Sequence, residues 1–127
     1  MTVPSSGEFV RTPFVMDRGK PGAALPRAVD KLVRAFIDDA GVPSHLLEWH
    51  GHNDFHKVVA NATTAWLYGC SAVNCAIFGF GERTGNTPLE AMVFEFLQLR
   101  GYDETIDTLA ITELANYVNA EMNYSIP

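Results

Sequence analysis

The sequence predicts an α/β protein with a parallel sheet. Apolar residues recur at helical spacing in residues 26–40, 54–68 and 88–100, and these segments alternate with short apolar runs at 46–52 and 72–78. Strands that alternate with helices of this length are typical of parallel sheets, because a helix carries the chain back across the sheet. The chain has 127 residues, which is enough for one domain at most. So few strands do not close a sheet, and the pattern alone predicts a piece of an α/β protein.

Residues 1–24 have the weakest pattern and are predicted to be poorly defined. They contain three prolines and three glycines, and one apolar run at 14–16 is predicted as a strand. The next segment is clearer, because Pro26 suits the first turn of a helix and Gly41 ends it. Its apolar stripe is formed by Leu25, Val29, Leu32, Val33, Phe36 and Ile37. We therefore expect a helix over residues 26–40.

The next apolar segment alternates as a strand does. Side chains two residues apart on a strand share a face, so Glu48, His50 and His52 would point the same way. Two imidazoles on one rigid element form half of a metal site. A surface His-x-His pair without a ligand is the alternative. The polar pair Asn53 and Asp54 directly after the strand favours the metal site, since sites in α/β barrels lie where strands end.

A helix and a second strand are predicted to follow. Asp54 is in a position to cap a helix that runs to about Tyr68 and ends at Gly69. Residues 72–78 are a β-type apolar run, so they are predicted as a second buried strand.

Two further helices are predicted near the C-terminus. Thr87-Pro88-Leu89-Glu90 is a capping box with proline at the first helical position. It predicts a helix that runs to about Arg100. A last amphipathic helix is expected over residues 112–123.

The composition disfavours several kinds of partner. A net charge of −6 argues against nucleic acids and anionic membranes. No apolar run approaches the ~20 residues that span a bilayer, and the N-terminus lacks the features of a secretory signal. Cys70 and Cys75 are too few for a disulfide scaffold and are expected to be small buried residues. We therefore expect a cytoplasmic protein.

Two motifs, His50–Asp54 and Gly79–Asn86, resemble those of the 2-isopropylmalate synthase and homocitrate synthase family. That family consists of metal-dependent (β/α)8 barrels related to hydroxymethylglutaryl-CoA lyase. The runs His50–Lys57, Trp66–Gly69 and Gly79–Glu82 are most similar to Re-type citrate synthases. The family places the first motif after its seventh strand and the second after its eighth. The resemblance therefore implies the C-terminal portion of a TIM barrel, about the last three βα units.

This resemblance implies an incomplete enzyme. Residues 25–101 would form a partial catalytic barrel, and residues 102–127 would form a helix that leads toward a missing subdomain. A full barrel needs about 250 residues, and the aspartate ligand and arginine of the family's first strand have no counterpart in this chain. We therefore expect the chain to be inactive alone. Its expected partner is a second copy, as a homodimer, or a complementary half of a barrel.

The resemblance also implies a metal centre. His50 and His52 would be ligands, and Asn86 would add its amide oxygen. This set suits Mg²⁺, Mn²⁺ or Zn²⁺, and the sequence does not choose among them. The cation would bind a 2-oxo acid and polarise its carbonyl for attack by the enolate of acetyl-CoA, the expected co-substrate. The catalytic acid or base is unknown and is expected outside this chain.

Each polar residue near these ligands has two interpretations. Glu48 would either orient an imidazole or stand as a carboxylate in a polar barrel interior. Asn53 and Asp54 would surround the ligands or belong to a substrate loop. Glu82 and Arg83 would order the glycine-rich loop or contact substrate, and a local ion pair that shapes the loop is the alternative.

Some residues depart from the family pattern. His56 stands where glycine is usual, and Ala76 and Phe78 stand where threonine and asparagine are common, so the sequence leaves the 2-oxo acid undefined. A lyase or carboxyltransferase of the same superfamily is an alternative function, and a non-catalytic truncated product is another. The related lyases carry a cysteine in the loop between Gly79 and Asn86. This chain has none there, which favours the synthases.

Overall fold

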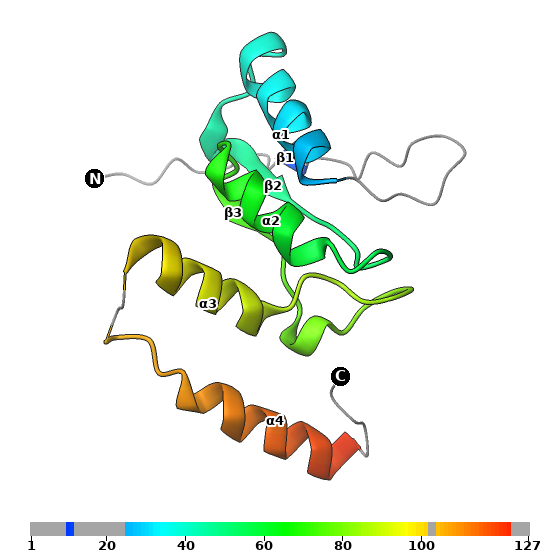
Figure 1. Ribbon diagram of the computed structural model, residues 1–127, viewed down its shortest axis with the longest axis vertical. Helices are drawn as coiled ribbons and strands as arrows, with labels where there is room; N and C mark the ends of the chain where they lie inside the picture. Colours follow the sequence, from blue (N-terminus) through cyan, green and yellow to red (C-terminus); the bar gives the residue numbers. More distant parts are fainter. Residues whose placement is uncertain (1–9, 12–24, 102–103, 123–127) are drawn as a thin grey trace. The chain divides into compact units, whose positions relative to one another are not determined.

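The computed structural model describes residues 10–11, 25–101 and 104–122 (Figure 1). Three short strands form one sheet in the order β1-β2-β3, and both neighbouring pairs run parallel. The strands are β1 (Val10–Arg11), β2 (Leu47–Trp49) and β3 (Ala72–Val73). The helices are α1 (Pro26–Arg34), α2 (Val58–Leu67), α3 (Leu89–Arg100) and α4 (Leu109–Met122). The predicted parallel α/β arrangement is confirmed, whereas the strand predicted at 14–16 lies outside the described residues.

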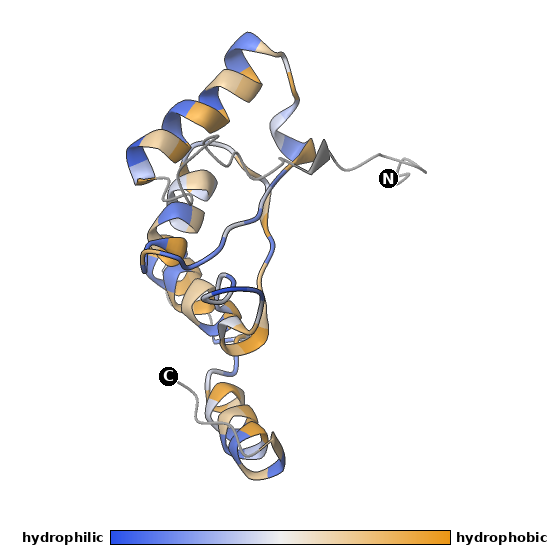
Figure 2. Cartoon of the chain, turned by 90° about the vertical axis from the view of Figure 1, so that its right-hand side faces the viewer, coloured by the Kyte–Doolittle hydropathy of each residue, from blue (hydrophilic) through white to orange (hydrophobic). Residues whose placement is uncertain are grey.

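The first helix follows its prediction closely. α1 has proline in its first turn, and a π-helical turn over Ala35–Asp39 extends it almost to the predicted end. Gly41 follows with φ +69°, a conformation that glycine adopts without steric cost. Hydrophobic and hydrophilic residues alternate along the turns of α1 in Figure 2, and its buried residues are Val29 and Val33.

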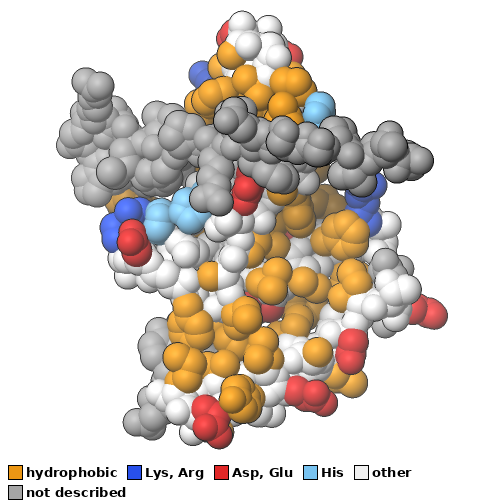
Figure 3. All heavy atoms as spheres, turned by 180° about the vertical axis from the view of Figure 1, so that it is seen from behind, with side chains coloured by type: hydrophobic (Ala, Val, Ile, Leu, Met, Phe, Trp, Pro, Cys, Tyr) orange, Lys and Arg blue, Asp and Glu red, His pale blue; other side chains and the backbone are white. Residues whose placement is uncertain are grey.

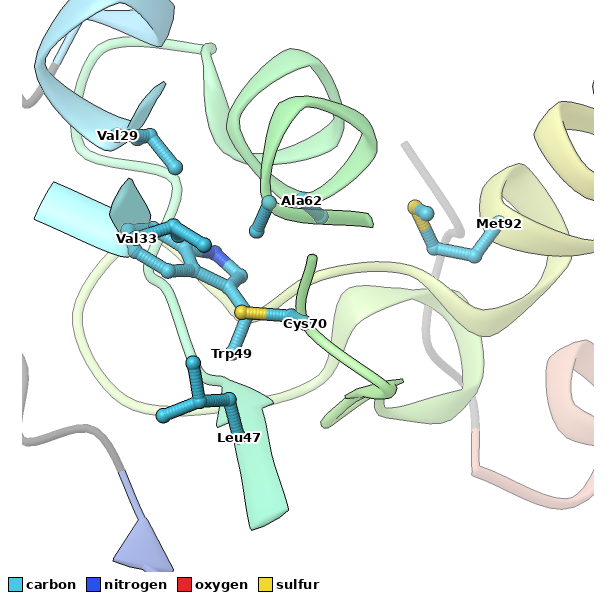
Figure 4. Close-up of a cluster of buried hydrophobic side chains, with 8 residues drawn as sticks. Val29, Val33, Leu47, Trp49, Ala62, Cys70 and Met92 are labelled. Atoms are coloured by element: carbon cyan, nitrogen blue, oxygen red, sulfur yellow. The ribbon is translucent and has the colours of Figure 1, made fainter. Parts of the chain in front are cut away.

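α1 and α2 cover the same face of the sheet. Leu47 and Trp49 are two residues apart on β2, so they point to one face, and they are 0% and 6% exposed. The buried side chains that form one cluster with them are Val29, Val33, Ala62, Ala65, Cys70 and Met92 (Figure 4). Helices on one face are the arrangement of a barrel, whose other face points to the interior. In this chain that other face carries the polar side chains of β2 and its extension.

The predicted alternation continues beyond the end of β2. Every second residue from Leu47 to Gly51 is buried, whereas Glu48, His50 and His52 are half-buried. β2 itself ends one residue before His50. Both histidines therefore lie just past the carboxyl end of a parallel strand, the end at which such sheets carry their sites.

The buried strand predicted over residues 72–78 is wrong for most of its length. β3 contains only its first two residues, and the chain then turns through a 3-10 helix at Ile77–Gly79, where Phe78 has φ +51°. The N–H of Phe78 donates to the carboxylate of Glu90 at 3.0 Å. Ile77 is 43% exposed. Apolar composition alone did not reveal that this segment bends out of the sheet.

Two predicted helix caps do not form. Residues 54–56 make a turn, so α2 begins at Val58 and Asp54 does not cap it. In place of the predicted capping box, the Glu90 carboxylate accepts the Phe78 N–H. The hydroxyl of Thr87 is buried and has no hydrogen-bond partner among the described residues.

Backbone contacts divide the chain into two compact units, Met1–Met92 and Val93–Pro127. In the second unit, α4 starts three residues before its predicted position, where the Leu109 N–H donates to the Asp107 carboxylate at 2.9 Å. No helix in the described part of the chain is both long and apolar enough to cross a membrane.

Candidate metal centre

Two loops meet beyond the carboxyl end of β2. We call residues His50–Asp54 the histidine loop and residues Gly79–Asn86 the glycine loop. His52 and Asn86 form an isolated antiparallel backbone bridge, and the Asn53 N–H donates to the Gly85 carbonyl at 2.9 Å. Residues opposite each other in an antiparallel pair carry their side chains on the same side. The bridge therefore brings the Asn86 amide to the side of the His52 imidazole.

The two imidazoles of the histidine loop converge on one point. The Nε2 atoms of His50 and His52 lie 3.2 Å apart. Their ring centroids are 4.9 Å apart and the planes cross at 84°. Both residues are half-buried, and histidine side chains reach the surface beside basic and acidic side chains in Figure 3. Each of the two residues is thus partly enclosed by protein and partly accessible.

The Asn86 side chain has its amide nitrogen engaged and its oxygen available. Nδ2 donates to the Phe80 carbonyl at 3.3 Å. Oδ1 is buried and makes no hydrogen bond to the part of the chain that the structure describes. Gly81 makes room for this amide, because a Cβ at that position would lie 2.8 Å from Oδ1 and closer still to the rest of the amide. A buried oxygen without a donor is costly unless a cation or a water binds it.

The spacing of the two imidazoles is compatible with one divalent cation. Imidazole nitrogens that bind one ion at about 2.1 Å, with tetrahedral or octahedral angles, lie about 3.0–3.4 Å apart. The Nε2–Nε2 separation of 3.2 Å falls within that range, and in the absence of a cation it is also a hydrogen-bond distance. The residues that the structure describes contain no group of three His, Cys, Asp or Glu side chains able to hold a metal ion. The donor set predicted from the sequence, two imidazoles with an amide oxygen, would suit Mg²⁺, Mn²⁺ or Zn²⁺.

A side chain that the sequence analysis missed joins Glu48 to the site. Asn74 Oδ1 lies 3.1 Å from His50 Nδ1, and Asn74 Nδ2 donates to Glu48 Oε1 at 3.1 Å. Glu48 therefore connects to an imidazole through an amide. The available signal was the single asparagine within the apolar run 72–78, at a position where a buried strand has no use for an amide.

Asp54 and Arg83 connect the two loops. Arg83 donates from Nε to Asp54 Oδ1 at 2.8 Å and from its terminal nitrogen to Asp54 Oδ2 at 2.7 Å. This two-point geometry favours the charged forms of both groups. The hydrogen bonds from Arg83 lower the pKa of Asp54, and the same carboxylate raises the pKa of Arg83. The pair spans two loops, whereas the sequence suggested a pair within the glycine loop.

The other polar residues singled out from the sequence have mainly local contacts. Asn53 accepts the Val58 N–H with Oδ1 at 3.4 Å, at the start of α2. The Glu82 side chain is exposed. The backbone carbonyl of Glu82 accepts the Gly85 N–H at 3.1 Å. These contacts shape the two loops. The roles of all the predicted site residues in binding or catalysis stay predictions.

Comparison with known proteins places these features in a family. A family model described as HMGL-like matches residues 21–118. The chain is 64% identical over 107 residues to a citrate (Re)-synthase of Syntrophus aciditrophicus. The matched region covers 84% of this chain and 17% of that protein. It is 49% identical over 106 residues to the citrate (Re)-synthase of Clostridium kluyveri, with 84% and 23% covered. A 2-isopropylmalate synthase of Methanocaldococcus jannaschii is 35% identical over 98 residues, with 77% and 18% covered.

A solved structure shares the fold. The match is an HMG-CoA lyase from Acinetobacter baumannii in complex with coenzyme A and 3-methylmalate, with a TM-score of 0.69 and 24% identity, over 82% of this chain and 35% of that chain. The predicted partial TIM barrel is thus confirmed as a fold, and which portion of the barrel it represents stays a prediction. The chain spans about a fifth of the length of the curated relatives, 17% and 23% for the two citrate (Re)-synthases.

Proposed function

Since the chain belongs to the HMGL-like family, we propose that it is the C-terminal part of the barrel of a metal-dependent acyltransferase that condenses acetyl-CoA with a 2-oxo acid. The identities of 64% and 49% to two citrate (Re)-synthases support a Re-citrate synthase type, with oxaloacetate as the 2-oxo acid. The order of the two motifs along the chain supports the C-terminal placement. The observation that carries the proposal is the convergence of His50 and His52 beside Asn86 at the carboxyl end of β2.

We infer that His50, His52 and Asn86 hold the divalent cation. A cation bound there would act as a Lewis acid toward the carbonyl of the 2-oxo acid. The residues of this chain fix where that carbonyl binds, because both imidazoles project from the end of β2 and the amide is anchored by the Phe80 carbonyl. The Arg83–Asp54 pair keeps the glycine loop against the histidine loop. Together they supply one side of a site that the rest of the barrel completes.

Calorimetry with Mn²⁺ and Zn²⁺ tests the metal centre. The His50→Ala, His52→Ala double variant should lose binding by at least about 100-fold, since both imidazole ligands are gone. The matched control is the His45→Ala, His56→Ala double variant, which removes the same number of histidines away from the convergence point. Wild type should bind weakly because the ligand set in this chain is incomplete. Equal affinities in wild type and in the His50, His52 variant would overturn the assignment.

Release of free CoA tests the reaction. The assay uses the longest protein that contains this segment, with acetyl-CoA and oxaloacetate, 2-oxoisovalerate or 2-oxoglutarate in turn. We expect release with oxaloacetate to be fastest. Cleavage of a hydroxyacyl-CoA without any CoA release would favour the lyase alternative. The 127-residue chain alone should release none, and turnover near the ~10 s⁻¹ of ordinary enzymes would contradict the proposal that this segment needs the rest of a barrel.

We also propose that the rest of a barrel, or a second copy of this chain, covers the strand edges and the hydrophobic side chains that this chain leaves exposed. In the part of the chain that the structure describes, β1 and β3 are the edge strands of the sheet. Hydrophobic side chains are exposed on the face drawn in Figure 3. Among the large exposed ones, Leu67 is 62% exposed and Leu109 is 73% exposed. Such edges and patches favour association. Light scattering after size-exclusion chromatography should find dimers or larger species, and a monodisperse monomer would contradict this.

A further inference from the structure

Asn74 occupies a defined place in the sheet. β2 and β3 pair in register with Glu48 opposite Ala72 and Trp49 opposite Val73, so one step further along the same register places Asn74 opposite His50. The Asn74 N–H donates to the Trp49 carbonyl at 2.7 Å, which continues the ladder past the end of the strands. The backbone therefore fixes the Asn74 side chain beside the His50 ring.

The carboxylate of Glu48 decides which way the Asn74 amide points. An ionised carboxylate only accepts hydrogen bonds, so the amide nitrogen of Asn74 must face it, as the 3.1 Å contact from Nδ2 to Oε1 shows. The amide oxygen then faces His50 Nδ1 at 3.1 Å. A carbonyl oxygen can only accept, so the proton of this hydrogen bond belongs to His50 Nδ1.

We propose that Asn74 is a positioning residue that holds His50 in its Nδ1–H tautomer. A neutral imidazole carries one proton, so a proton on Nδ1 leaves the lone pair on Nε2. Nε2 is the atom that lies 3.2 Å from His52 Nε2, at the convergence point. This inference rests on the proposed metal function, because a cation needs that lone pair. It assigns to Asn74 and Glu48 the choice of which nitrogen faces the cation.

The arrangement matters because a neutral histidine side chain in water prefers the other tautomer, with its proton on Nε2. A ring with its proton on Nε2 would direct that proton at the convergence point and would have to exchange tautomers before a cation could bind. Groups that fix the orientation and tautomer of a ligating histidine typically account for about 10- to 100-fold in metal affinity. The loss of the Asn74 amide should therefore weaken cation binding by that factor.

Three variants test this proposal on the full chain. Asn74→Leu removes both hydrogen bonds at similar volume. The Glu48→Gln, Asn74→Asp double variant exchanges the two functional groups, so that the new Gln amide donates to the new Asp carboxylate, which still accepts from His50 Nδ1. Asn119→Leu is the matched control, since it makes the same chemical change at an exposed position of α4.

The first readout is the ¹⁵N NMR spectrum of the imidazole nitrogens in the metal-free chain at about pH 8.5, where ordinary imidazoles are neutral. We expect protonated Nδ1 at His50 in wild type, in the exchanged double variant and in Asn119→Leu, and a mixture with protonated Nε2 in Asn74→Leu. The second readout is Zn²⁺ affinity, expected to fall about 10- to 100-fold in Asn74→Leu only. Protonated Nε2 at His50 in wild type would overturn the proposal, as would an unchanged tautomer in Asn74→Leu.

The two readouts separate this proposal from the metal centre itself. If wild type has protonated Nδ1 at His50 but binds no cation, the metal centre fails and the role of Asn74 in the tautomer stands. If Asn74→Leu does not fold, the exchanged double variant decides, because it retains the hydrogen bonds and must show wild-type protonation. Loss of the Nδ1 proton in a folded double variant would overturn the proposal.

Discussion

The histidine loop and the glycine loop bring their ligands together by different means. In the histidine loop, the ring of His50 is oriented by polar side chains, Asn74 and behind it Glu48. In the glycine loop, the Asn86 amide is anchored by backbone carbonyls. The Gly79 carbonyl accepts the backbone N–H of Asn86 at 2.8 Å, and the Phe80 carbonyl accepts a hydrogen bond from Asn86 Nδ2. The histidine loop should therefore be sensitive to lost hydrogen-bonding groups, and the glycine loop to added volume.

Gly85→Ala should have the largest effect. Gly85 has φ +97°, and a Cβ there would lie 2.5 Å from the Gly79 carbonyl oxygen. The backbone conformation alone costs about 1–2 kcal/mol with a side chain, and the clash is with backbone that cannot rotate away. We expect the free energy of unfolding in urea to fall by about 3 kcal/mol or more. Gly41→Ala is the control, because φ is +69° and no atom lies within 4 Å. Equal losses in the two variants would mean that close backbone approach does not hold the glycine loop.

Gly81→Ala should weaken cation binding with a smaller loss of stability. Its φ is not in the left-handed region, and the three atoms nearest to the added Cβ would all belong to the Asn86 side chain. The amide must rotate away, so we expect affinity for Mn²⁺ to fall about 10- to 100-fold, which equals about 1.4–2.7 kcal/mol. Calorimetry measures this. In an Asn86→Ala background the same substitution should cost nothing further. An additional loss there would show that Gly81 does not act through Asn86.

The core beneath the histidine loop can be probed through Cys70. The residue is 5% exposed, and burial raises the pKa of its thiol to about 11, from 9.0 for an unburied one. Unfolding above pH 9 therefore releases a proton, so this contribution to stability is complete below pH 9 and is lost as the pH rises toward 11. The part lost by pH 10 amounts to about 1.4 kcal/mol. Wild type should lose that much more stability between pH 7 and pH 10 than Cys70→Ala. Identical pH dependences would contradict the burial of the thiol.

His56→Gly should have the smallest effect and the opposite sign. His56 follows the histidine loop with φ +53°, and its side chain is exposed. Glycine adopts this conformation without steric cost, so we expect the free energy of unfolding to rise by about 0.5–1 kcal/mol. Phe78→Gly is the comparison, since φ is +51° but the ring is buried, and it should be destabilising. A destabilised His56→Gly variant would indicate that the His56 side chain contributes contacts of its own.

The features that follow from local periodicity were predictable from the sequence. The helix over residues 26–40 and the alternation from Leu47 to His52 each depend on neighbours within a few residues, and both are observed. The end of β3 was not predictable in this way. The turn that follows it is held by hydrogen bonds to groups distant in the sequence, such as the contact of the Phe78 N–H with Glu90.

The contacts that build the site depend on the tertiary fold. The Arg83–Asp54 pair and the Asn74–Glu48 contact each join residues that periodicity cannot relate. Asn86 entered the predicted ligand set through family resemblance, because nothing in the spacing of the glycine loop points to an amide ligand. The structure adds the reason that it suits the role, which is a buried oxygen with its amide nitrogen already bound.

The bridge between His52 and Asn86 has a kinetic consequence. The two loops share backbone hydrogen bonds, including the one from the Asn53 N–H to the Gly85 carbonyl, so we expect them to open together. Their protected amides should therefore exchange with solvent hydrogen as one cooperative unit with a single opening free energy. An interaction that stabilises the closed form of one loop should therefore slow hydrogen exchange in both.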